Sequence, residues 1–347
     1  MPAGVCWRIG APRVAQSASS LAKALAHGLV PAVPVPHRAD GRFDPQAQDA
    51  YAAWMAQQDI AGVAVWAHTG RGLHLSEETA AAVLSSWRRA LPGKVVIAGA
   101  GARPRSLSSH PGTRLTPPAD PQGRTSFVIQ ATLEMAARAR DLGADAILVY
   151  PPVLVADLGD GERRIVEVHA ALEEVGLPVL AFLLYEAAGG CPYSHRVLDR
   201  ILALAHVAGI KVATLDSPRT FQDTASRVPP DKLLITGEDR FLGESLTMGA
   251  RAALIGMGAA QTGLQAALLA ALARGEHERF LRLSSACDRF GAAGFQEPVD
   301  GYPRRLLHLL AAQGIIAREA AFDPFGPEVP ARQLQEVEKV ARDLPSS

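Results

Sequence analysis

A short apolar run, a turn and an amphipathic stretch rich in alanine, leucine and arginine follow one another eight times along this chain. The runs lack the polar alternation of half-exposed strands, so they predict strands buried on both faces, which is typical of parallel strands covered by helices. The expected strands are Leu29–Val33, Gly62–Trp66, Lys94–Ala98, Ala146–Tyr150, Pro178–Leu183, Val207–Lys211, Lys232–Thr236 and Ala252–Gly256. Eight strand-then-helix units favour an α/β fold of the (β/α)8 TIM-barrel type, although an open sheet of six or seven strands would give a similar pattern.

The barrel is expected to span residues 1–260, and residues 261–347 are expected to form a C-terminal helical extension. Apolar residues at helical spacing predict helices in this extension at Leu264–Leu272, His277–Phe290 and Pro303–Ala312. Because no further strand is expected after residue 256, the extension does not have the pattern of a separate enzyme domain.

Residues 103–124 interrupt the repeat with a stretch rich in proline, serine, glycine and arginine that has no periodicity. They follow the third expected strand, which in a barrel places them at the C-terminal mouth, where active sites lie. The segment therefore predicts a long loop inserted beside the site, and it either covers the site or is a solvated insertion. The next helix is expected at Phe127–Leu142.

The charges of the chain balance, with 35 lysine and arginine residues against 35 aspartate and glutamate residues. A neutral chain lacks the basic surface expected of a protein that binds nucleic acid or an anionic membrane, so neither is an expected partner. The first 30 residues contain no continuous apolar segment of a secretory signal. Apolar runs reach only about ten residues, whereas a membrane span needs about 20. We therefore expect a cytoplasmic protein.

The sequence has no strong cofactor or metal motif. Cys6, Cys191 and Cys287 are far apart and form no CxxC pair, which argues against a disulfide framework or a thiolate zinc site. Gly99-Ala100-Gly101 lacks the third glycine and the downstream acid of a dinucleotide fingerprint, and no Walker A sequence occurs. The histidines are dispersed, without a familiar metal-binding spacing. We expect neither a metal nor a nucleotide cofactor.

Lys211 is the most informative residue at an expected strand end, which is where a barrel carries its catalytic groups. It closes the apolar run from Val207, so its amine is expected to project into a mostly apolar mouth. Desolvation lowers the pKa of a lysine and favours the neutral amine that forms a Schiff base with a carbonyl substrate. The alternative is a solvated charge at the end of a strand. Glu238 and Asp239 follow the seventh strand, but adjacent side chains point in different directions and predict no carboxylate pair.

Seven short blocks, in order over residues 28 to 285, resemble the dihydrodipicolinate synthase / N-acetylneuraminate lyase family of class I aldolases. The blocks are Gly28–Ala32, Asp40-Gly41 with Phe43-Asp44, Gly62-Val63 with His68–Gly70, Val96–Gly101, Leu142–Ala146, Gly209–Thr214, and Thr236–Asp239 with Met248–Ala250. The resemblance implies a (β/α)8 barrel with C-terminal helices, commonly a homotetramer. It also implies a lysine that forms an imine with a 2-keto acid, typically pyruvate.

Four residues match functional positions of that family. Lys211 matches the Schiff-base lysine, and Tyr185 matches the tyrosine that acts as general acid and base near the imine. Thr69 and Gly70 match the turn whose hydroxyl and backbone N–H groups hold the carboxylate of the keto acid. An anion in a dry pocket needs several such aligned donors.

Two residues in this turn depart from the family pattern. His68 stands where the family has a threonine, and Arg71 stands where it has an acid. His68 is either a proton relay, since imidazole titrates near neutral pH, or a histidine bonded to a neighbouring backbone group. Arg71 either binds an anionic group on the distal part of the substrate or forms an ion pair at the surface or a subunit interface.

Two further departures lie after the fourth and fifth expected strands. The family often has a pair of relay aromatic hydroxyls after strand four, whereas this chain has Tyr150-Pro151-Pro152-Val153. Gly190 stands where the synthase has the arginine that recognises the carboxylate of its second substrate. We therefore do not expect the synthase activity of lysine biosynthesis, and we expect the glycine-rich stretch to leave room for a bulkier substrate.

Together these features predict a Schiff-base-forming lyase or aldolase that acts on a 2-keto acid, with or without an aldehyde as second substrate. The expected catalytic residues are Lys211, Tyr185 and His68, and the expected substrate-binding residues are Thr69, Gly70 and Arg71. The chain is expected to form a homo-oligomer, either a dimer or a tetramer. The alternative is a non-catalytic ligand-binding or regulatory barrel that retains Lys211 by descent.

Overall fold

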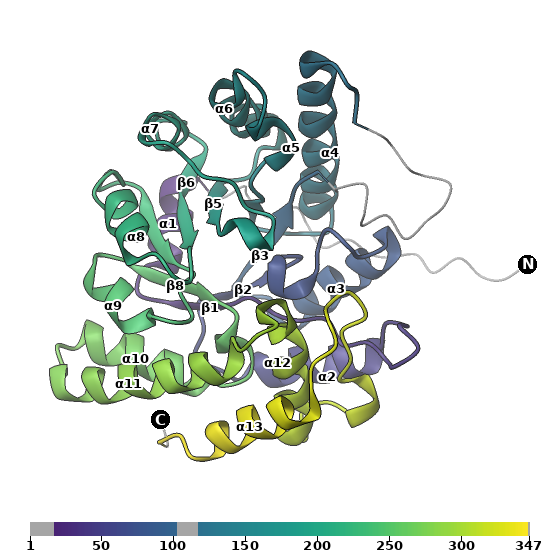
Figure 1. Ribbon diagram of the computed structural model, residues 1–347, viewed down its shortest axis with the longest axis vertical. Helices are drawn as coiled ribbons and strands as arrows, with labels where there is room; N and C mark the ends of the chain where they lie inside the picture. Colours follow the sequence, from purple (N-terminus) through teal and green to yellow (C-terminus); the bar gives the residue numbers. More distant parts are fainter. Residues whose placement is uncertain (1–16, 103–116, 346–347) are drawn as a thin grey trace, which may run out of the picture.

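The computed structural model describes residues 17–102 and 117–345. Its strands form one parallel sheet in the order β1-β8-β7-β6-β5-β4-β3-β2 (Figure 1). Their bounds are Leu29–Pro31 (β1), Gly62–Val65 (β2), Val95–Ala100 (β3), Ala146–Val149 (β4), Val179–Leu184 (β5), Val207–Ala213 (β6), Leu233–Thr236 (β7) and Ala252–Ile255 (β8). A parallel bridge between Ala32 and Ala64 joins the two ends of the sheet and closes the ring. The predicted (β/α)8 barrel is confirmed.

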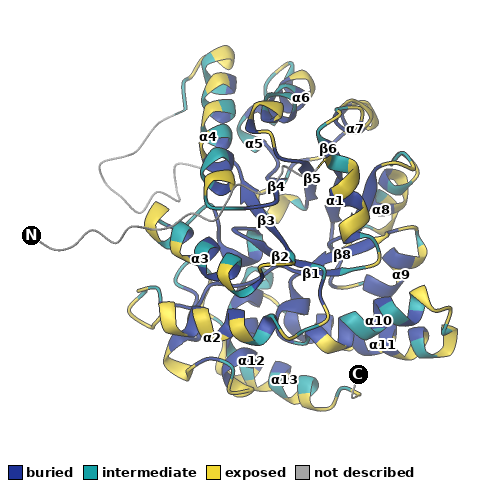
Figure 2. Ribbon diagram, turned by 180° about the vertical axis from the view of Figure 1, so that it is seen from behind, coloured by how far each residue is buried: buried dark blue, intermediate teal, exposed yellow. Residues whose placement is uncertain are grey.

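Helices surround the barrel, with their outer faces in solvent and the strands buried behind them (Figure 2). Their bounds are Ala18–Leu25 (α1), Pro45–Met55 (α2), Glu77–Ala90 (α3), Pro121–Asp141 (α4), Val153–Ala156 (α5), Gly161–Ala171 (α6), His195–Leu202 (α7), Pro218–Ala225 (α8) and Leu242–Thr247 (α9). Side chains that face into the barrel, among them Leu148 and Phe182, form an apolar cluster of their own. Leu21 and Leu25 of α1 belong to this cluster, so α1 closes the N-terminal end of the barrel.

Every strand lies within two residues of its predicted bounds, but β6 differs where it matters most. Lys211 does not close this strand, as we expected, because β6 continues through Val212 and Ala213. Both additional residues pair with β5, and Val212 also pairs with β7. Lys211 is therefore held by strand neighbours on both sides, which fixes its backbone more firmly than a strand end would.

The predicted loop insertion at residues 103–124 is described only in part. Residues 103–116 lie outside the described residues. Residues 121–124 form the first turn of α4, which begins six residues before the predicted Phe127. The helix begins earlier because Asp120 caps it: its carboxylate accepts a hydrogen bond from the Gly123 N–H (2.7 Å). Pro121 occupies the first turn, where proline is favoured.

The C-terminal extension contains the three predicted helices as α10 (Thr262–Ala273), α11 (His277–Gly294) and α12 (Tyr302–Ala312). It also contains α13 (Ala331–Arg342), which was not predicted. Helix α12 contacts the turn that follows β2, and Phe322 forms an antiparallel bridge with His37 in the loop after β1. The extension thus folds back over the mouth of the barrel.

No helix in the described part of the chain combines the length and the apolar character that crossing a bilayer requires.

Candidate active site

Lys211 lies inside the C-terminal mouth of the barrel and is only 6% exposed. Its ammonium nitrogen lies 4.1 Å from the centre of the Phe182 ring, on the neighbouring strand β5. Burial lowers the pKa of Lys211 from 10.5 to about 8, although the negative charges of Asp239 and Glu238 oppose this shift. A substantial fraction of the amine is therefore neutral near physiological pH, which is the form that attacks a carbonyl carbon.

Gly237, at the end of β7, makes room for this lysine. A Cβ atom at position 237 would lie 2.5 Å from Cε of Lys211 and 2.9 Å from Cβ of Ala213. A side chain at this position would push the end of Lys211 aside, so the glycine is needed for the lysine to lie where it does.

The two buried carboxylates near Lys211 point in different directions, as predicted. Glu238 accepts hydrogen bonds from the backbone N–H groups of Thr214 (2.6 Å) and Leu215 (2.8 Å) after β6. Asp239 accepts from the N–H groups of residues 256–257 after β8 (3.1 and 2.7 Å). Burial raises the pKa of Glu238 to about 7 and that of Asp239 to about 6. Both carboxylates brace neighbouring strand ends and supply negative charge near the lysine.

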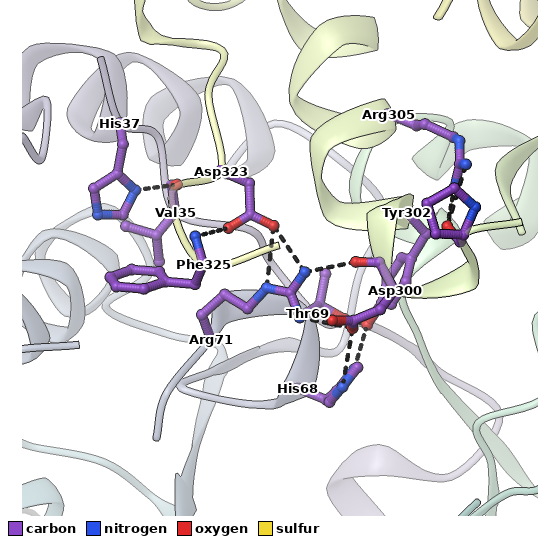
Figure 3. Close-up of polar contacts among 11 residues, drawn as sticks. Val35, His37, His68, Thr69, Arg71, Asp300, Tyr302, Arg305, Asp323 and Phe325 are labelled. Atoms are coloured by element: carbon purple, nitrogen blue, oxygen red, sulfur yellow. Dashed lines mark hydrogen bonds and ion pairs between the residues drawn. The ribbon is translucent and has the colours of Figure 1, made fainter. Parts of the chain in front are cut away.

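The turn after β2 is a short 3₁₀ helix over His68–Gly70, and a tyrosine from the C-terminal extension lies on it (Figure 3). The hydroxyl of Tyr302 lies 2.8 Å from Oγ1 of Thr69 and 3.1 Å from Nδ1 of His68. The ring of Tyr302 stacks on the rings of His68 and Phe295, with centroids 5.9 and 4.6 Å away. Three groups that can carry a proton thus meet at one point of the mouth.

His68 is a neutral imidazole in this arrangement. Burial, together with the positive charges of Arg71 and Lys211, lowers its pKa to about 3. Its second ring nitrogen, Nε2, lies 3.4 Å from the carboxylate of Asp300, which is half-exposed. The ring of His68 is therefore bonded to the side chain of Tyr302 on the C-terminal extension, and not to a neighbouring backbone group.

Tyr185 follows β5 and packs against the ring of the same histidine. Its ring centroid is 6.4 Å from that of His68, in an edge-on arrangement. Burial and the negative charge of Asp300 raise the pKa of Tyr185 above its usual value, so the phenol holds its proton at neutral pH. The structure therefore brings Tyr185, His68 and Thr69 together at the mouth that contains Lys211.

Gly70 has a different role from the one we expected. Its N–H donates to the carbonyl of Ala67 (3.0 Å), so it is used inside the turn. A Cβ atom at this position would lie 2.7 Å from the carbonyl oxygen of Val33. Gly70 lets the turn pack against the loop after β1, and Thr69 is the residue of the pair whose side chain faces the cluster.

Arg71 does not offer a free guanidinium to a substrate, which corrects the expectation that it binds a distal anionic group. Its Nε and Nη2 donate to Asp323 (3.1 and 2.8 Å), and its Nη1 donates to Asp300 (2.7 Å) (Figure 3). Nη2 also donates to the backbone carbonyl of Asp300 (2.6 Å). Both partners belong to the C-terminal extension of the same chain, so the ion pair is intramolecular and fastens that extension to the turn after β2.

Two other expectations about nearby loops are refined. A Cβ atom at Gly190 would overlap the carbonyl oxygen of Leu184, so this glycine is required by a tight turn and does not create space. The space that we expected for a bulkier substrate is therefore not at position 190.

After β4, the hydroxyl of Tyr150 donates to the carbonyl of Trp66 (2.9 Å) and holds the strand ends together.

Tyr302 is the site residue that the sequence did not predict. It is separated from Thr69 by 233 positions, and only folding of the extension over the mouth brings the two hydroxyls together. No spacing within residues 296–304 distinguishes this tyrosine from an ordinary core aromatic. Asp300 and Asp323 were missed for the same reason.

Gly256, after β8, is expected to be required for the position of Tyr302. A Cβ atom there would lie 2.8 Å from Cε2 of Tyr302, whose ring is already packed against the rings of His68 and Phe295. Gly256→Ala should lower the free energy of unfolding by about 1–3 kcal/mol through overpacking, measured by urea denaturation. Gly93→Ala is the matched control, because nothing lies within 4 Å of its Cβ position. Equal stability of the two variants would contradict this packing.

Among residues 17–102 and 117–345, no group of three or more histidine, cysteine, aspartate or glutamate side chains is arranged to hold a metal ion.

Comparisons of sequence agree with this geometry. A family model described as the dihydrodipicolinate synthetase family matches residues 125–343, which is more than half of the chain. A 4-hydroxy-tetrahydrodipicolinate synthase of Stenotrophomonas maltophilia strain K279a is 28% identical over 225 residues. The aligned part covers 64% of this chain and 66% of that relative, just under two thirds of its length.

Solved structures share the fold over nearly their whole length. A dihydrodipicolinate synthase from Oceanobacillus iheyensis has a TM-score of 0.76 and 18% identity, covering 94% of this chain and 98% of its own. An N-acetylneuraminate lyase from Mycoplasma synoviae has a TM-score of 0.71 and 20% identity, covering 92% and 98%. Together with the family model and the barrel itself, these matches place the chain in the dihydrodipicolinate synthetase family, to which it belongs.

Proposed function

We propose that the protein is a Schiff-base-forming lyase or aldolase that acts on a 2-keto acid of the pyruvate type. The observation that carries this proposal is the buried amine of Lys211, whose pKa is lowered to about 8 inside the mouth of a (β/α)8 barrel. Relatives and fold neighbours are named as synthases and lyases, which are enzymes of this kind.

In the proposed reaction, the neutral amine of Lys211 attacks C2 of the keto acid. A C–N bond forms, the carbonyl oxygen leaves as water, and the resulting iminium draws electrons from the adjacent bond. Thr69 holds the carboxylate of the keto acid, and Tyr185 donates and accepts the protons that imine formation and loss of water require. The iminium itself is the electron sink, so the proposal needs no metal or nucleotide cofactor.

For the remainder of the substrate we propose a pocket of about 720 Å³ that begins at Tyr185 and Thr214, next to the mouth. Its charged lining residues are Glu186, Asp216 and Asp223, and no lysine or arginine of the described chain lines it. An acidic pocket repels a second substrate with a free carboxylate. We therefore propose a neutral or cationic aldehyde partner, and an activity other than that of the lysine-biosynthesis synthase. A cytoplasmic, homo-oligomeric enzyme is part of the same proposal.

Borohydride trapping tests the proposal. The protein is incubated with pyruvate and other 2-keto acids, reduced, and analysed by intact mass and peptide mapping. We expect one covalent adduct on Lys211 and none in Lys211→Met. Lys232→Met is the matched control, because Lys232 is also buried but its amine is bonded to backbone carbonyls (2.7 and 3.0 Å). Absence of an adduct with any keto acid would instead favour a non-catalytic ligand-binding barrel.

A further inference from the structure

Tyr302 connects the mouth of the barrel to solvent through a continuous row of polar side chains. Thr69, at one end of the row, is the group proposed to hold the keto acid. The Tyr302 hydroxyl bonds to Thr69 and to Nδ1 of His68, and Nε2 of His68 faces the half-exposed carboxylate of Asp300 (Figure 3). Within the described C-terminal extension, only the side chains of Tyr302 and Asp300 make polar contacts with Thr69 or His68.

The partners of His68 assign the direction of these hydrogen bonds. The carboxylate of Asp300 lies 3.4 Å from Nε2 of His68 and accepts hydrogen bonds when ionised, so we infer the tautomer in which Nε2 carries the hydrogen. A neutral imidazole has only one N–H, which leaves Nδ1 as an acceptor for the Tyr302 hydroxyl. The oxygen of Tyr302 is then free to accept from the Thr69 hydroxyl in the resting site. When a keto acid binds, this single hydrogen turns to its carboxylate and leaves the Tyr302 oxygen free to take up a proton. The row is therefore ordered from Thr69 through Tyr302 to His68 and Asp300.

We propose that Tyr302 is a proton-relay residue, which carries protons between a keto acid bound at Thr69 and the imidazole of His68. This inference rests on the proposed imine chemistry of Lys211. In the relay step, the C3–H bond of the iminium breaks and its electron pair forms a C2–C3 double bond, while the C2–N π electrons return to nitrogen. The proton moves to the oxygen of Tyr302 as the proton of Tyr302 moves to Nδ1 of His68. The products are a neutral enamine and an imidazolium that faces Asp300.

The charge balance of this step favours the transfer. In the resting site, the positive charge of Lys211 is one of the influences that keep His68 neutral. Conversion of the iminium to the enamine removes that positive charge at the moment when His68 gains one. The positive charge thus moves from Lys211 toward Asp300, whose carboxylate stabilises it.

The relay is held in place by the C-terminal extension rather than by the barrel. Arg305 is fully buried and donates to the carbonyls of Gly294 (3.0 Å) and Pro298 (3.3 Å), and to the side chain of Gln333 (2.6 Å). These bonds fix the segment that contains Asp300 and Tyr302. One chain therefore supplies every group of the row, and the relay requires no residue from a partner subunit.

Exchange of the pyruvate methyl protons with D₂O, followed by NMR, measures the relay step without knowledge of the second substrate. We expect Tyr302→Phe to slow the maximal exchange rate about tenfold or more. The pyruvate concentration at half-maximal rate should stay within about twofold, and so should borohydride trapping on Lys211, because the phenyl ring preserves both stacking contacts. Tyr51→Phe is the matched control, since it removes a buried hydroxyl that donates to a backbone carbonyl in the core (2.8 Å); its exchange rate should equal that of the wild type.

The outcomes separate this inference from the proposed function. Undiminished exchange in Tyr302→Phe, with trapping intact, would overturn the relay and leave the imine chemistry standing. Loss of trapping in the wild type would overturn both. If Tyr302→Phe does not fold, Asp300→Asn provides the test, because Asp300 is half-exposed and its neutral amide no longer stabilises the imidazolium. Slower exchange at unchanged trapping supports the relay, and unchanged exchange overturns it.

Discussion

Replacement of Arg71 by methionine is expected to lower the free energy of unfolding by about 3–5 kcal/mol, the cost typical of breaking a buried ion pair by removing one partner. The side chain of Asp323 is 4% exposed and accepts two bonds from Arg71. Without the guanidinium, its charge stays buried without its cationic partner. Asp300 would also lose the group that holds it to the turn after β2. Urea denaturation followed by circular dichroism measures the change.

A double variant and a surface variant identify the cause. Arg71→Met combined with Asp323→Leu should recover much of the lost stability, because replacing both partners of a buried pair with apolar groups is often nearly neutral. Arg89→Met should cost at most about 1 kcal/mol, since Arg89 and its partner Asp49 are both more than half exposed. If Arg71→Met cost no more than Arg89→Met, the extension would not be fastened in the way described.

Imine formation by Lys211 is expected to increase with pH up to about 8 and then level off. The amine attacks only when neutral, and burial lowers its pKa to about 8. At pH 7, a lysine with this pKa is neutral about 300 times more often than one with the ordinary value of 10.5. Below pH 7, the rate of trapping should fall about tenfold for each pH unit.

The measurement is borohydride trapping with pyruvate across pH 6 to 11, quantified for Lys211 and for the exposed Lys339 in the same digest. The Lys339 peptide serves as an internal reference for the reducing conditions. Asp239 raises the pKa of Lys211, so Asp239→Asn should move the midpoint below that of the wild type. A midpoint near 10.5 for the wild type would show that the mouth is more hydrated than its geometry implies.

The barrel could be predicted from sequence because its signals are local. Each strand is a continuous apolar run, and the sheet needs only neighbouring runs to pair, so all eight strands were placed within two residues. Helix starts depend on one or two side chains, and the Asp120 cap was overlooked, so α4 begins earlier than predicted. The extension of β6 beyond Lys211 depends on pairing with β5 and β7, which a single run does not encode.

The candidate site was predictable only in the half that belongs to the barrel. Lys211 and Tyr185 follow from strand positions, together with the resemblance of the surrounding blocks. The partners of His68 and Arg71 lie more than 220 positions away in sequence, and the extension reaches them only after folding. Arg71 therefore looked available to a substrate, whereas its charge is used within the chain.

The ion pair between Arg71 and Asp323 can form only after both residues have been synthesised, so it forms late in translation. Arg71 is synthesised 252 positions before its partner, which at about 5–20 residues per second corresponds to roughly 13–50 s of translation. During that interval the guanidinium has no carboxylate from the extension and must remain in water, because burying it alone is too costly. A nascent chain on the ribosome can thus possess Lys211 and Tyr185 before the turn over His68–Gly70 is fixed. Lys211 is thus made before Asp300, Tyr302 and Asp323, the residues of the extension that position the turn over His68–Gly70.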